Sequence, residues 1–205
     1  MTDNLFSRYN RKDYIQSIYC YKDTEVYKNK LNIRDPDNLL SIENDLTYQR
    51  LSELHIEPVR GHFGVRHLLN IHKYIFQDLY YFAGKIRKED IIKGDTRFCS
   101  CQYIMENLNN LLLELKKNNF LIGLSINDFI EKSAFLLSEL NMIHPFREGN
   151  GRAIREYYRC LALKNGYIID WSLVDSKDLL NAFIYSVTKD CSKLTDCIYR
   201  VIENK

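Results

Sequence analysis

The twelve residues HPFREGNGRAIR, positions 144–155, combine a group that can move a proton with groups that can bind an anion. His144 supplies an imidazole, which can accept a proton near neutral pH. Glu148 supplies a carboxylate, and two glycines and three arginines fill much of the rest. The whole chain contains only five histidines and eight glycines. Their concentration here indicates a site that binds a strongly anionic ligand and transfers a proton.

The sequence on either side predicts that this segment is a loop leading into a helix. Pro145 disfavours helical geometry at His144, so the apolar helix before it is expected to end there. The next helix is expected to begin near Asn150 and to stop at Gly166, a left-handed C-cap. The first turn of a helix presents unpaired N–H groups and the positive end of the helix dipole. Phosphate is a common ligand of such a turn.

The side chains around this turn suit a phosphate chain. Gly149 and Gly151 let backbone amides approach an oxygen atom without an intervening Cβ. Arg152 and Arg155 project from one side of the helix, where two guanidiniums suit a multiply charged phosphate better than a single carboxylate. Glu148 would repel a phosphate unless a cation lay between them. Mg²⁺, which binds one carboxylate together with phosphate oxygens, would remove that conflict.

Each of these features also has a structural interpretation when it is taken alone. A histidine near a helix end is usually structural, and a Gly-Asn-Gly sequence is usually an ordinary turn. Arg152 and Arg155 could form a solvated helix face, and Phe146 is expected to bury its ring and fix the loop. One short loop contains all of these features, which favours a site. No Walker or Rossmann glycine pattern competes for a nucleotide elsewhere in the chain.

The rest of the chain reads mostly as helices. Apolar residues recur at three- and four-residue spacing, which predicts helices over 65–84, 103–117, 125–141, 153–165, 176–189 and 192–204. The segment RKEDIIKGDTRFCS is the exception, because Gly94 and Asp95 between apolar residues predict a short hairpin. The expectation is therefore a mostly helical domain with one small β element.

Composition excludes several classes of protein. At 205 residues, with 45% hydrophobic and 27% charged residues, the chain suits one compact soluble domain. A net charge of +2 gives no global field that would attract nucleic acid or a membrane. The six cysteines include no C-x-x-C pair, so zinc is not expected. Short apolar stretches and a polar N-terminus predict no membrane span, no secretory signal and a reducing cytoplasm. The basic, aromatic segment YNRKDYIQSIYCYKDTEVYKNK is balanced by acids, so no direct nucleic-acid binding is expected.

The segment HPFREGNGRAIR resembles the signature of Fic-domain proteins, H-P-F-x-[D/E]-G-N-G-R-x-x-R, at every defined position. NKLNI, HLLNIHKYIFQDLYYFAGKIR, IIKGDTRFC, NMIHPF and NGYIIDW also resemble Fic segments in the expected order, so the resemblance spans roughly 20–200. It implies an all-α Fic fold, a helical bundle with a short β-hairpin flap. The implied organisation is a single domain over 1–205, with an arm at about 1–25, a core at about 26–200, a flap at about 90–99 and an active-site loop at 144–152.

This resemblance implies a nucleotidyltransferase that moves AMP from ATP to a hydroxyl of a target protein and releases pyrophosphate. His144 would be the general base, and Glu148 would hold Mg²⁺ against the α- and β-phosphates. Arg152 would contact the phosphate chain, and Arg155 would hold the γ-phosphate. The anion-binding turn would consist of Gly149, Asn150 and Gly151.

The resemblance also assigns a role to the hairpin. The flap would pair its backbone with an extended segment of the target protein, a form of strand addition. Its docking residues would be Ile92, Lys93, Gly94 and Asp95. The structural alternative is an ordinary surface hairpin.

Many Fic proteins inhibit themselves with a helix of sequence [S/T]-x-x-x-E-[G/N], whose glutamate pairs with the second arginine of the motif. No Ser or Thr in this chain is followed by Glu four residues later. Glu203-Asn204 could belong to a degenerate version, but Tyr199 stands where Ser or Thr should be. The chain thus resembles stand-alone bacterial FicT toxins. That resemblance implies a small separate antitoxin carrying S-x-x-x-E-G, and DNA gyrase and topoisomerase IV as targets, modified on a tyrosine in the cytoplasm.

Three alternatives remain open from the sequence. A Doc-like kinase would transfer the γ-phosphate, but its motif has Lys in place of the second glycine, and Gly151 is intact here. Transfer of another nucleotide or of phosphocholine is compatible with the motif, which does not encode base contacts. A non-catalytic binding module is disfavoured because His144, Glu148, Arg152 and Arg155 are all present.

Overall fold

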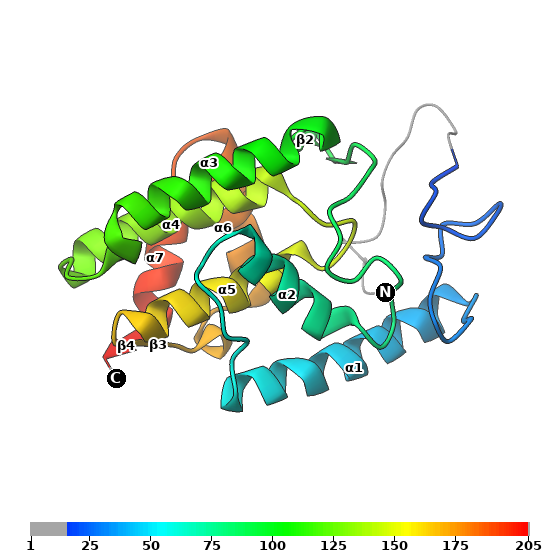
Figure 1. The fold of residues 1–205 in the computed structure, drawn as a ribbon, viewed down its shortest axis with the longest axis horizontal. Coiled ribbons are helices and arrows are strands. Elements are labelled where there is room, and N and C mark those ends of the chain that lie inside the picture. Colours follow the sequence, from blue (N-terminus) through cyan, green and yellow to red (C-terminus); the bar gives the residue numbers. More distant parts are fainter. Residues whose placement is uncertain (1–15, 205) are drawn as a thin grey trace.

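The structure is a computed structural model that describes residues 16–204 (Figure 1). Within that range the chain is mostly helical, with two short antiparallel sheets. The α-helices are α1 (Pro36–Ile56), α2 (Val65–Phe76), α3 (Ile104–Lys117), α4 (Ile126–Ile143), α5 (Asn150–Lys164), α6 (Ser176–Thr188) and α7 (Ser192–Val201). The strands are β1 (Ile92–Lys93), β2 (Thr96–Arg97), β3 (Tyr167–Ile169) and β4 (Ile202–Asn204).

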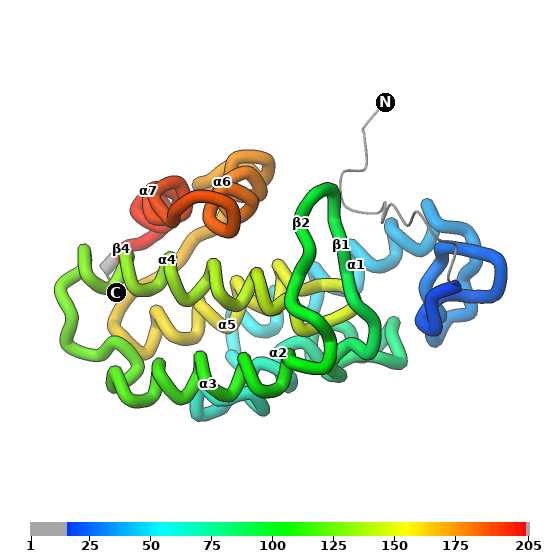
Figure 2. The backbone as a smooth tube through the Cα atoms, turned by 90° about the horizontal axis from the view of Figure 1, so that it is seen from above, coloured from blue at the N-terminus to red at the C-terminus, as the bar shows by residue number. Residues whose placement is uncertain are grey.

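Helix α5 lies at the centre of the bundle. It packs against α2 on one side and α4 on the other, and α6 and α7 cover the far side of α4 (Figures 1 and 2). The α5 side chains that build the core are fully buried, among them Ala153, Ile154, Tyr157, Tyr158 and Leu161. Because α5 is held on several sides, its first turn has a fixed position.

Helix α4 ends where the sequence predicts. Its N-cap is Ser125, whose Oγ accepts a hydrogen bond of 3.2 Å from the backbone N–H of Asp128. Its C-cap is His144, which adopts a left-handed conformation with φ 48° and ψ 60°. Helix α5 begins at Asn150, and Gly166 follows it with φ +83°. The loop predicted between two helix ends is therefore confirmed.

The helix predicted over 65–84 is too long. Helix α2 stops at Phe76, although Leu79 and Phe82 are buried as their spacing indicates. In a longer helix the carbonyls of Gln77 and Leu79 would accept from Tyr81 and Ala83. Lys30 uses both carbonyls instead, because its Nζ donates to Gln77 O at 2.6 Å and its backbone N–H donates to Leu79 O at 2.8 Å. A segment far away in the sequence thus takes the hydrogen-bonding groups that would have continued the helix.

The two small sheets confirm one prediction and correct another. Strands β1 and β2 form the predicted hairpin around Gly94 and Asp95. The helix predicted to reach 204 ends at Val201, and the last three residues of that range pair with β3 in a second sheet. The pairing of Ile202 with Ile169 explains the break, because β3 offers residues 202–204 an antiparallel partner strand.

Helix α1 has no clear periodic signal in the sequence. Its buried face includes Glu43 and Thr47 beside Leu39 and Leu54, so polar and apolar residues share that face. Its start is marked by Asp35, whose side chain accepts from the N–H of Asn38 at 2.8 Å. The arm predicted at about 1–25 lies largely outside the described residues.

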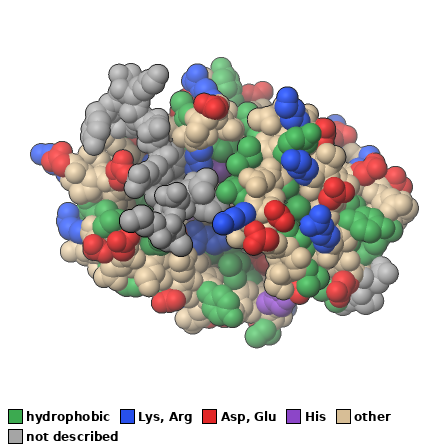
Figure 3. Space-filling view, turned by 180° about the vertical axis from the view of Figure 1, so that it is seen from behind, with side chains coloured by type: hydrophobic (Ala, Val, Ile, Leu, Met, Phe, Trp, Pro, Cys, Tyr) green, Lys and Arg blue, Asp and Glu red, His purple; other side chains and the backbone are tan. Residues whose placement is uncertain are grey.

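The surface carries mixed charge. Figure 3 shows acidic and basic side chains interspersed on the face opposite to that of Figure 1, with hydrophobic side chains scattered among them. Within residues 16–204, no helix is both long and apolar enough to cross a bilayer.

Candidate active site

The loop between α4 and α5 is held in shape by its own asparagine. The side chain of Asn150 accepts from the N–H of Phe146 and donates to its carbonyl, both at 2.8 Å. The ring of Phe146 is fully buried and stacks on His72 with 3.8 Å between ring centroids. Because the Asn150 amide is used within the loop, a ligand at this turn would meet its backbone N–H and not its side chain.

Two glycines allow close packing at the start of α5. Gly149 has φ +78°, and a Cβ there would lie 2.1 Å from Cζ of Phe76. Gly151 lies against the guanidinium of Arg155, since a Cβ there would be 3.3 Å from Arg155 Nη1. Gly149 and Gly151 thus add no side chain that would cover the backbone N–H groups at the start of α5. The N–H groups of that turn have no acceptor within the helix.

The first arginine of α5 is bound by protein groups. Arg152 contacts a carboxylate oxygen of Glu43 through Nη2 and donates to Oγ1 of Thr47 at 3.0 Å. Its Cζ lies 4.7 Å from the centroid of the Phe76 ring, and Glu148 Oε1 lies 3.9 Å from its Nη2. Helix α1 therefore fixes the direction of Arg152.

The second arginine has no such partner. Among residues 16–204, no carboxylate or hydrogen-bond acceptor contacts the half-buried side chain of Arg155. Burial, and then the charge of Arg152, lower the pKa of Arg155 to about 10, so it remains a cation at neutral pH. A half-buried cation without a counter-charge is costly unless an anion binds there.

His144 offers one nitrogen that the protein does not use. Its Nδ1 lies 3.1 Å from the carbonyl of Asn141, so Nδ1 carries the proton and Nε2 keeps its lone pair. Nε2 is buried and has no hydrogen-bond partner among the described residues. Burial, followed by the charge of Lys93, holds the pKa of His144 well below its usual range. The imidazole is therefore a neutral base at pH 7, with the ring of Phe98 stacked 3.8 Å from it.

Glu148 is fixed through its backbone. Its carbonyl accepts from His72 Nε2 at 2.9 Å, while the N–H of Gly84 donates to His72 Nδ1 at 2.8 Å. Burial lowers the pKa of His72 to about 3, so this bridge is neutral. The Glu148 carboxylate accepts from the N–H of Gly149 at 2.8 Å and is 21% exposed.

The sequence analysis missed the residues outside the motif that hold it. His72 is a histidine among the apolar positions of α2, and a buried polar residue in such a face could have been a signal. Glu43 is 6% exposed and accepts from the hydroxyl of Tyr80 as well as from Arg152. Nothing in the sequence marks Glu43, because it lies on a helix whose buried face is mixed.

The hairpin projects beside the C-terminal end of α4 and the N-terminal end of α5 (Figure 2). Ile92 and Gly94 are exposed, as is Asp95, while Lys93 is half-buried and lies near enough to His144 to lower its pKa. The tip is open with respect to residues 16–204, since none of their atoms lies within 4 Å of a Cβ built on Gly94. The predicted flap and the predicted base are therefore neighbours in the structure.

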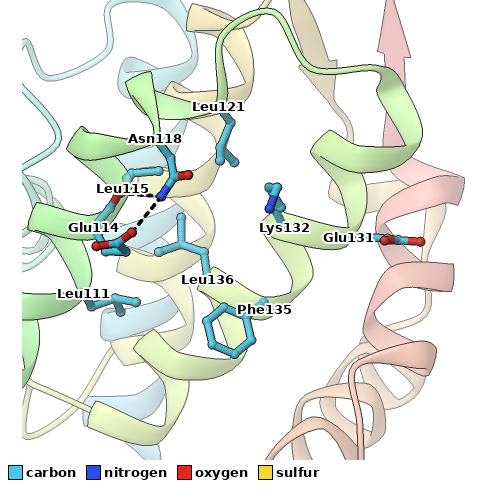
Figure 4. Close-up of a pocket in the computed structure, with 9 residues that line it drawn as sticks. All are labelled: Leu111, Glu114, Leu115, Asn118, Leu121, Glu131, Lys132, Phe135 and Leu136. Carbon is cyan, nitrogen blue, oxygen red and sulfur yellow. Dashed lines mark hydrogen bonds between the residues drawn. The ribbon is translucent and has the colours of Figure 1, made fainter.

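A cavity of about 400 Å³ lies elsewhere, between α3 and α4 (Figure 4). Its lining consists of Leu111, Glu114, Leu115, Asn118, Leu121, Glu131, Lys132, Phe135 and Leu136. None of the motif residues takes part in it. The unpaired groups, and not this cavity, therefore mark the site where chemistry is possible.

The described residues offer no protein cage for a metal ion. Within 16–204, no three His, Cys, Asp or Glu side chains gather around one point. Glu148 places a carboxylate beside the first turn of α5. This arrangement fits Mg²⁺, which is commonly bound by one carboxylate together with phosphate oxygens.

The chain matches known proteins over most of its length. The model of the Fic/DOC family matches residues 45–160. "Protein adenylyltransferase VbhT" of Bartonella schoenbuchensis is 37% identical over 168 residues, which are 82% of this chain and 35% of the relative, so the chain spans about a third of that protein. "Probable protein adenylyltransferase Fic" of Escherichia coli is 35% identical over 160 residues, which cover 78% of each protein.

A solved structure shows the same fold. The BepC protein of Bartonella tribocorum, crystallised with bound AMPPNP, aligns with a TM-score of 0.86 and 27% sequence identity. The alignment covers 91% of this chain and 97% of that one. A similar fold therefore binds an ATP analogue in that protein.

Proposed function

The chain belongs to the Fic/DOC family, and from this premise we propose that it moves AMP from ATP to a hydroxyl group of a target protein. The enzyme class is protein adenylyltransferase, which is also in the names of its relatives in Bartonella and Escherichia coli. The observation that carries the proposal is a pair of unmade bonds, one at the end of α4 and one at the start of α5. Among residues 16–204, Arg155 lacks an anion and His144 Nε2 lacks a proton donor.

ATP would bind with its phosphates against the first turn of α5. The backbone N–H groups of Asn150, Gly151 and Arg152 would donate hydrogen bonds to phosphate oxygens, since the helix provides them with no acceptor. Arg155 would hold the γ-phosphate, which leaves the α-phosphate nearer to the loop. Arg152 contributes positive charge from a fixed direction, because Glu43 and Thr47 already hold it.

The transfer step needs a base and a clear line of attack. The hydroxyl of the target donates its proton to His144 Nε2 while its oxygen attacks the α-phosphorus. The new P–O bond forms as the bond to the oxygen that bridges the α- and β-phosphates breaks, and pyrophosphate leaves. The buried, neutral state of His144 suits this role at pH 7.

Glu148 is the residue that would hold Mg²⁺. When bound, the ion supplies positive charge that neutralises the phosphate chain. Glu148 itself is positioned by its carbonyl bond to His72 and by its carboxylate bond to the N–H of Gly149. The loop stays rigid because Asn150 closes it onto Phe146.

The flap would present the target. An extended segment would pair with the backbone of the hairpin near Ile92 and Lys93, with the open tip at Gly94 and Asp95. Lys93 lies close enough to His144 to influence its pKa, so a segment docked there would lie near the base. Backbone pairing reads few side chains, so other surfaces must select the target.

The regulatory class we propose is that of a bacterial toxin held by a separate antitoxin in the cytoplasm. Arg155 is unpaired among residues 16–204, as expected if the inhibitory glutamate comes from another chain. Glu203 cannot supply it from a helix in this conformation, because Glu203 and Asn204 lie in β4, which pairs with the strand after the far end of α5. The targets we propose are DNA gyrase and topoisomerase IV, modified on a tyrosine.

Isotope transfer tests the reaction. Purified chain is incubated with Mg²⁺, ATP and a gyrase subunit, with the label on the α- or the γ-phosphate in parallel reactions. Label from the α-phosphate alone is expected on the target, and its transfer is expected to be lost in His144→Ala. Transfer of the γ label would indicate a kinase, and no transfer of either label to gyrase or to topoisomerase IV would contradict the proposed target.

A further inference from the structure

One guanidinium outside the motif joins three segments of the site. Arg87 is 1% exposed, and within residues 16–204 the hydrogen-bond acceptors of its side chain are all backbone carbonyls. Nε donates to His144 O at 2.7 Å, and Nη1 donates to Glu89 O at 2.6 Å. Nη2 donates to Cys99 O and, at 3.4 Å, to Ile143 O. These four acceptors use most of the donors that a guanidinium has.

The acceptors have a specific arrangement along the chain. Glu89 precedes the hairpin and Cys99 follows it, so Arg87 holds both ends of the flap. His144 and Ile143 form the end of α4. Two backbone bonds strengthen the same junction, from Arg87 N to Pro145 O at 2.9 Å and from Cys99 N to Met142 O at 3.1 Å.

The charge of Arg87 is not neutralised by a close ion pair. Its nearest carboxylate oxygen in the described residues belongs to Asp90 and lies 3.9 Å away. Arg159 differs, because that equally buried arginine makes two bonds to Glu156, at 2.7 and 2.8 Å, as well as one to Leu54 O. A buried guanidinium that binds mainly carbonyls is retained at an electrostatic cost, which points to a role in geometry.

The backbone of His144 needs such a restraint. Its φ of 48° lies in the left-handed region, which non-glycine residues rarely adopt. The bond from Arg87 fixes the carbonyl of that residue, and Phe98, which comes directly before Cys99, stacks on its imidazole. Two contacts therefore fix His144: Arg87 binds its backbone carbonyl, and the ring of Phe98 from the flap stacks on its imidazole.

We propose that Arg87 is a positioning residue that couples the flap to His144, so that a target segment docked on the flap and the base that deprotonates it keep a fixed mutual geometry. The proposal rests on the proposed transfer reaction for its purpose. The junction itself is defined by hydrogen bonds, so it can also be tested without any activity. Arg87 does not touch the reacting atoms.

A matched pair of variants separates positioning from simple stability. Lysine keeps the charge but offers donors from a single point, so Arg87→Lys cannot reach carbonyls on both ends of the flap and on His144. Arg159→Lys is the control, because it removes the same fork from an equally buried arginine away from the flap. Each variant is compared at a temperature well below its unfolding transition.

Three measurements are made on each protein. Amide hydrogen exchange reports the opening of 89–99 and of 141–145 in the absence of nucleotide. The ¹⁵N resonance of the His144 ring reports its environment. The rate constant kcat, the KM for the target and the dissociation constant of ATP report how catalysis and binding change.

In Arg87→Lys, exchange at both segments and the His144 resonance are expected to change together, and kcat is expected to fall on the order of 100-fold, as for a reacting group displaced by about 1 Å. ATP affinity should stay within about twofold, because α5 is untouched. Arg159→Lys should change neither the flap nor the resonance. Equal effects in the two variants, or a flap that loosens while His144 stays unchanged, would overturn the proposal.

Wild-type protein gives a second test that needs no variant to fold. The amides of Arg87, Cys99 and His144 should exchange in one cooperative opening, with a common protection factor and denaturant dependence. Independent opening of the three would also overturn the coupling. The exchange results do not depend on ATP. Failure of the wild-type protein to transfer label would therefore count against the proposed function, while the exchange data would still decide whether Arg87 couples the flap to His144.

Discussion

The two arginines at the start of α5 lie one turn apart but have opposite surroundings. Arg152 is bound by Glu43 and Thr47 of α1 and lies over the ring of Phe76. Arg155 is half-buried and meets no anion in the described part of the chain. The difference teaches that the protein has completed one side of the site with its own groups and has left the other side to a ligand.

His144 belongs with the incomplete side. Its Nδ1 is bound to Asn141 O, while Nε2 is buried and has no partner in the part of the chain that the structure describes. Folded proteins rarely leave such groups unpaired, because each unpaired group costs stability. Changes on the incomplete side should therefore reduce activity with little loss of stability, and changes on the complete side should also reduce stability.

The largest effect is expected from His144→Ala. Loss of a general base should lower kcat by about 10²–10⁴-fold. The affinity for ATP should change little, because the phosphates would lie on α5. Nucleotide binding by calorimetry and single-turnover label transfer check the two halves of this statement, and a variant with more than half of the wild-type rate would contradict the role of the imidazole.

Arg155→Ala should have the next largest effect. Removing one charged donor from a developing negative charge costs about 10²–10³-fold in kcat for comparable sites. The free energy of unfolding without nucleotide should stay equal or rise, because a half-buried unpaired cation is removed. Chemical denaturation tests the second point, and a clear loss of stability would show that a protein group pairs with Arg155 after all.

Glu43→Ala should show the opposite pattern, with a large loss of stability and a smaller loss of transfer rate. It leaves the partly buried Arg152 without its carboxylate and Tyr80 without its acceptor, so the free energy of unfolding should fall by about 3 kcal/mol, the low end for breaking a buried pair. The loss of transfer rate should be smaller, about tenfold, because Arg152 keeps its bond to Thr47. A larger loss of transfer rate in Glu43→Ala than in Arg155→Ala would contradict the comparison between the two arginines.

The pH dependence of transfer should be shallow on the acid side. Burial, with the charge of Lys93, holds the pKa of His144 below the usual 6.5, so the neutral form persists as the pH falls through that value. The rate should therefore keep a plateau below pH 6.5 and decline only at lower pH. An acid limb centred at 6.5 or above would show that the ring is solvated in the active conformation.

The smallest effect concerns simple anions. Inorganic phosphate should bind the first turn of α5 weakly and raise the melting temperature by a few degrees or less at millimolar concentration, as expected from binding to the folded state alone. Arg155→Ala should abolish this shift, whereas Glu43→Ala should keep part of it. Equal shifts in wild type and Arg155→Ala would place the anion elsewhere.

The motif could be predicted from the sequence because it is contiguous. His144, Glu148 and the residues up to Arg155 lie within twelve positions, and the ends of α4 and α5 follow from local signals at Ser125, Pro145 and Gly166. The hairpin could also be predicted, since Gly94-Asp95 is a local turn signal. Elements whose structure depends on residues close together in the sequence could therefore be predicted from that local sequence.

What could not be predicted depends on contacts between distant segments. Glu43 reaches Arg152 across 109 positions, and Arg87 reaches His144 across 57. The helical pattern after α2 does not continue because Lys30 binds the carbonyls of Gln77 and Leu79, and residues 202–204 leave α7 because β3 offers a partner. None of these contacts leaves a periodic or local trace in the sequence.

The most direct test of the central claim is a crystal structure of the chain with Mg²⁺ and an ATP analogue that cannot be cleaved. The γ-phosphate should lie within hydrogen-bonding distance of the Arg155 guanidinium, and the α-phosphate should lie beside His144 Nε2. Arg152 should keep its contact with Glu43. A nucleotide bound elsewhere, for example between α3 and α4, with the start of α5 empty, would contradict the assignment of this turn as the ATP site.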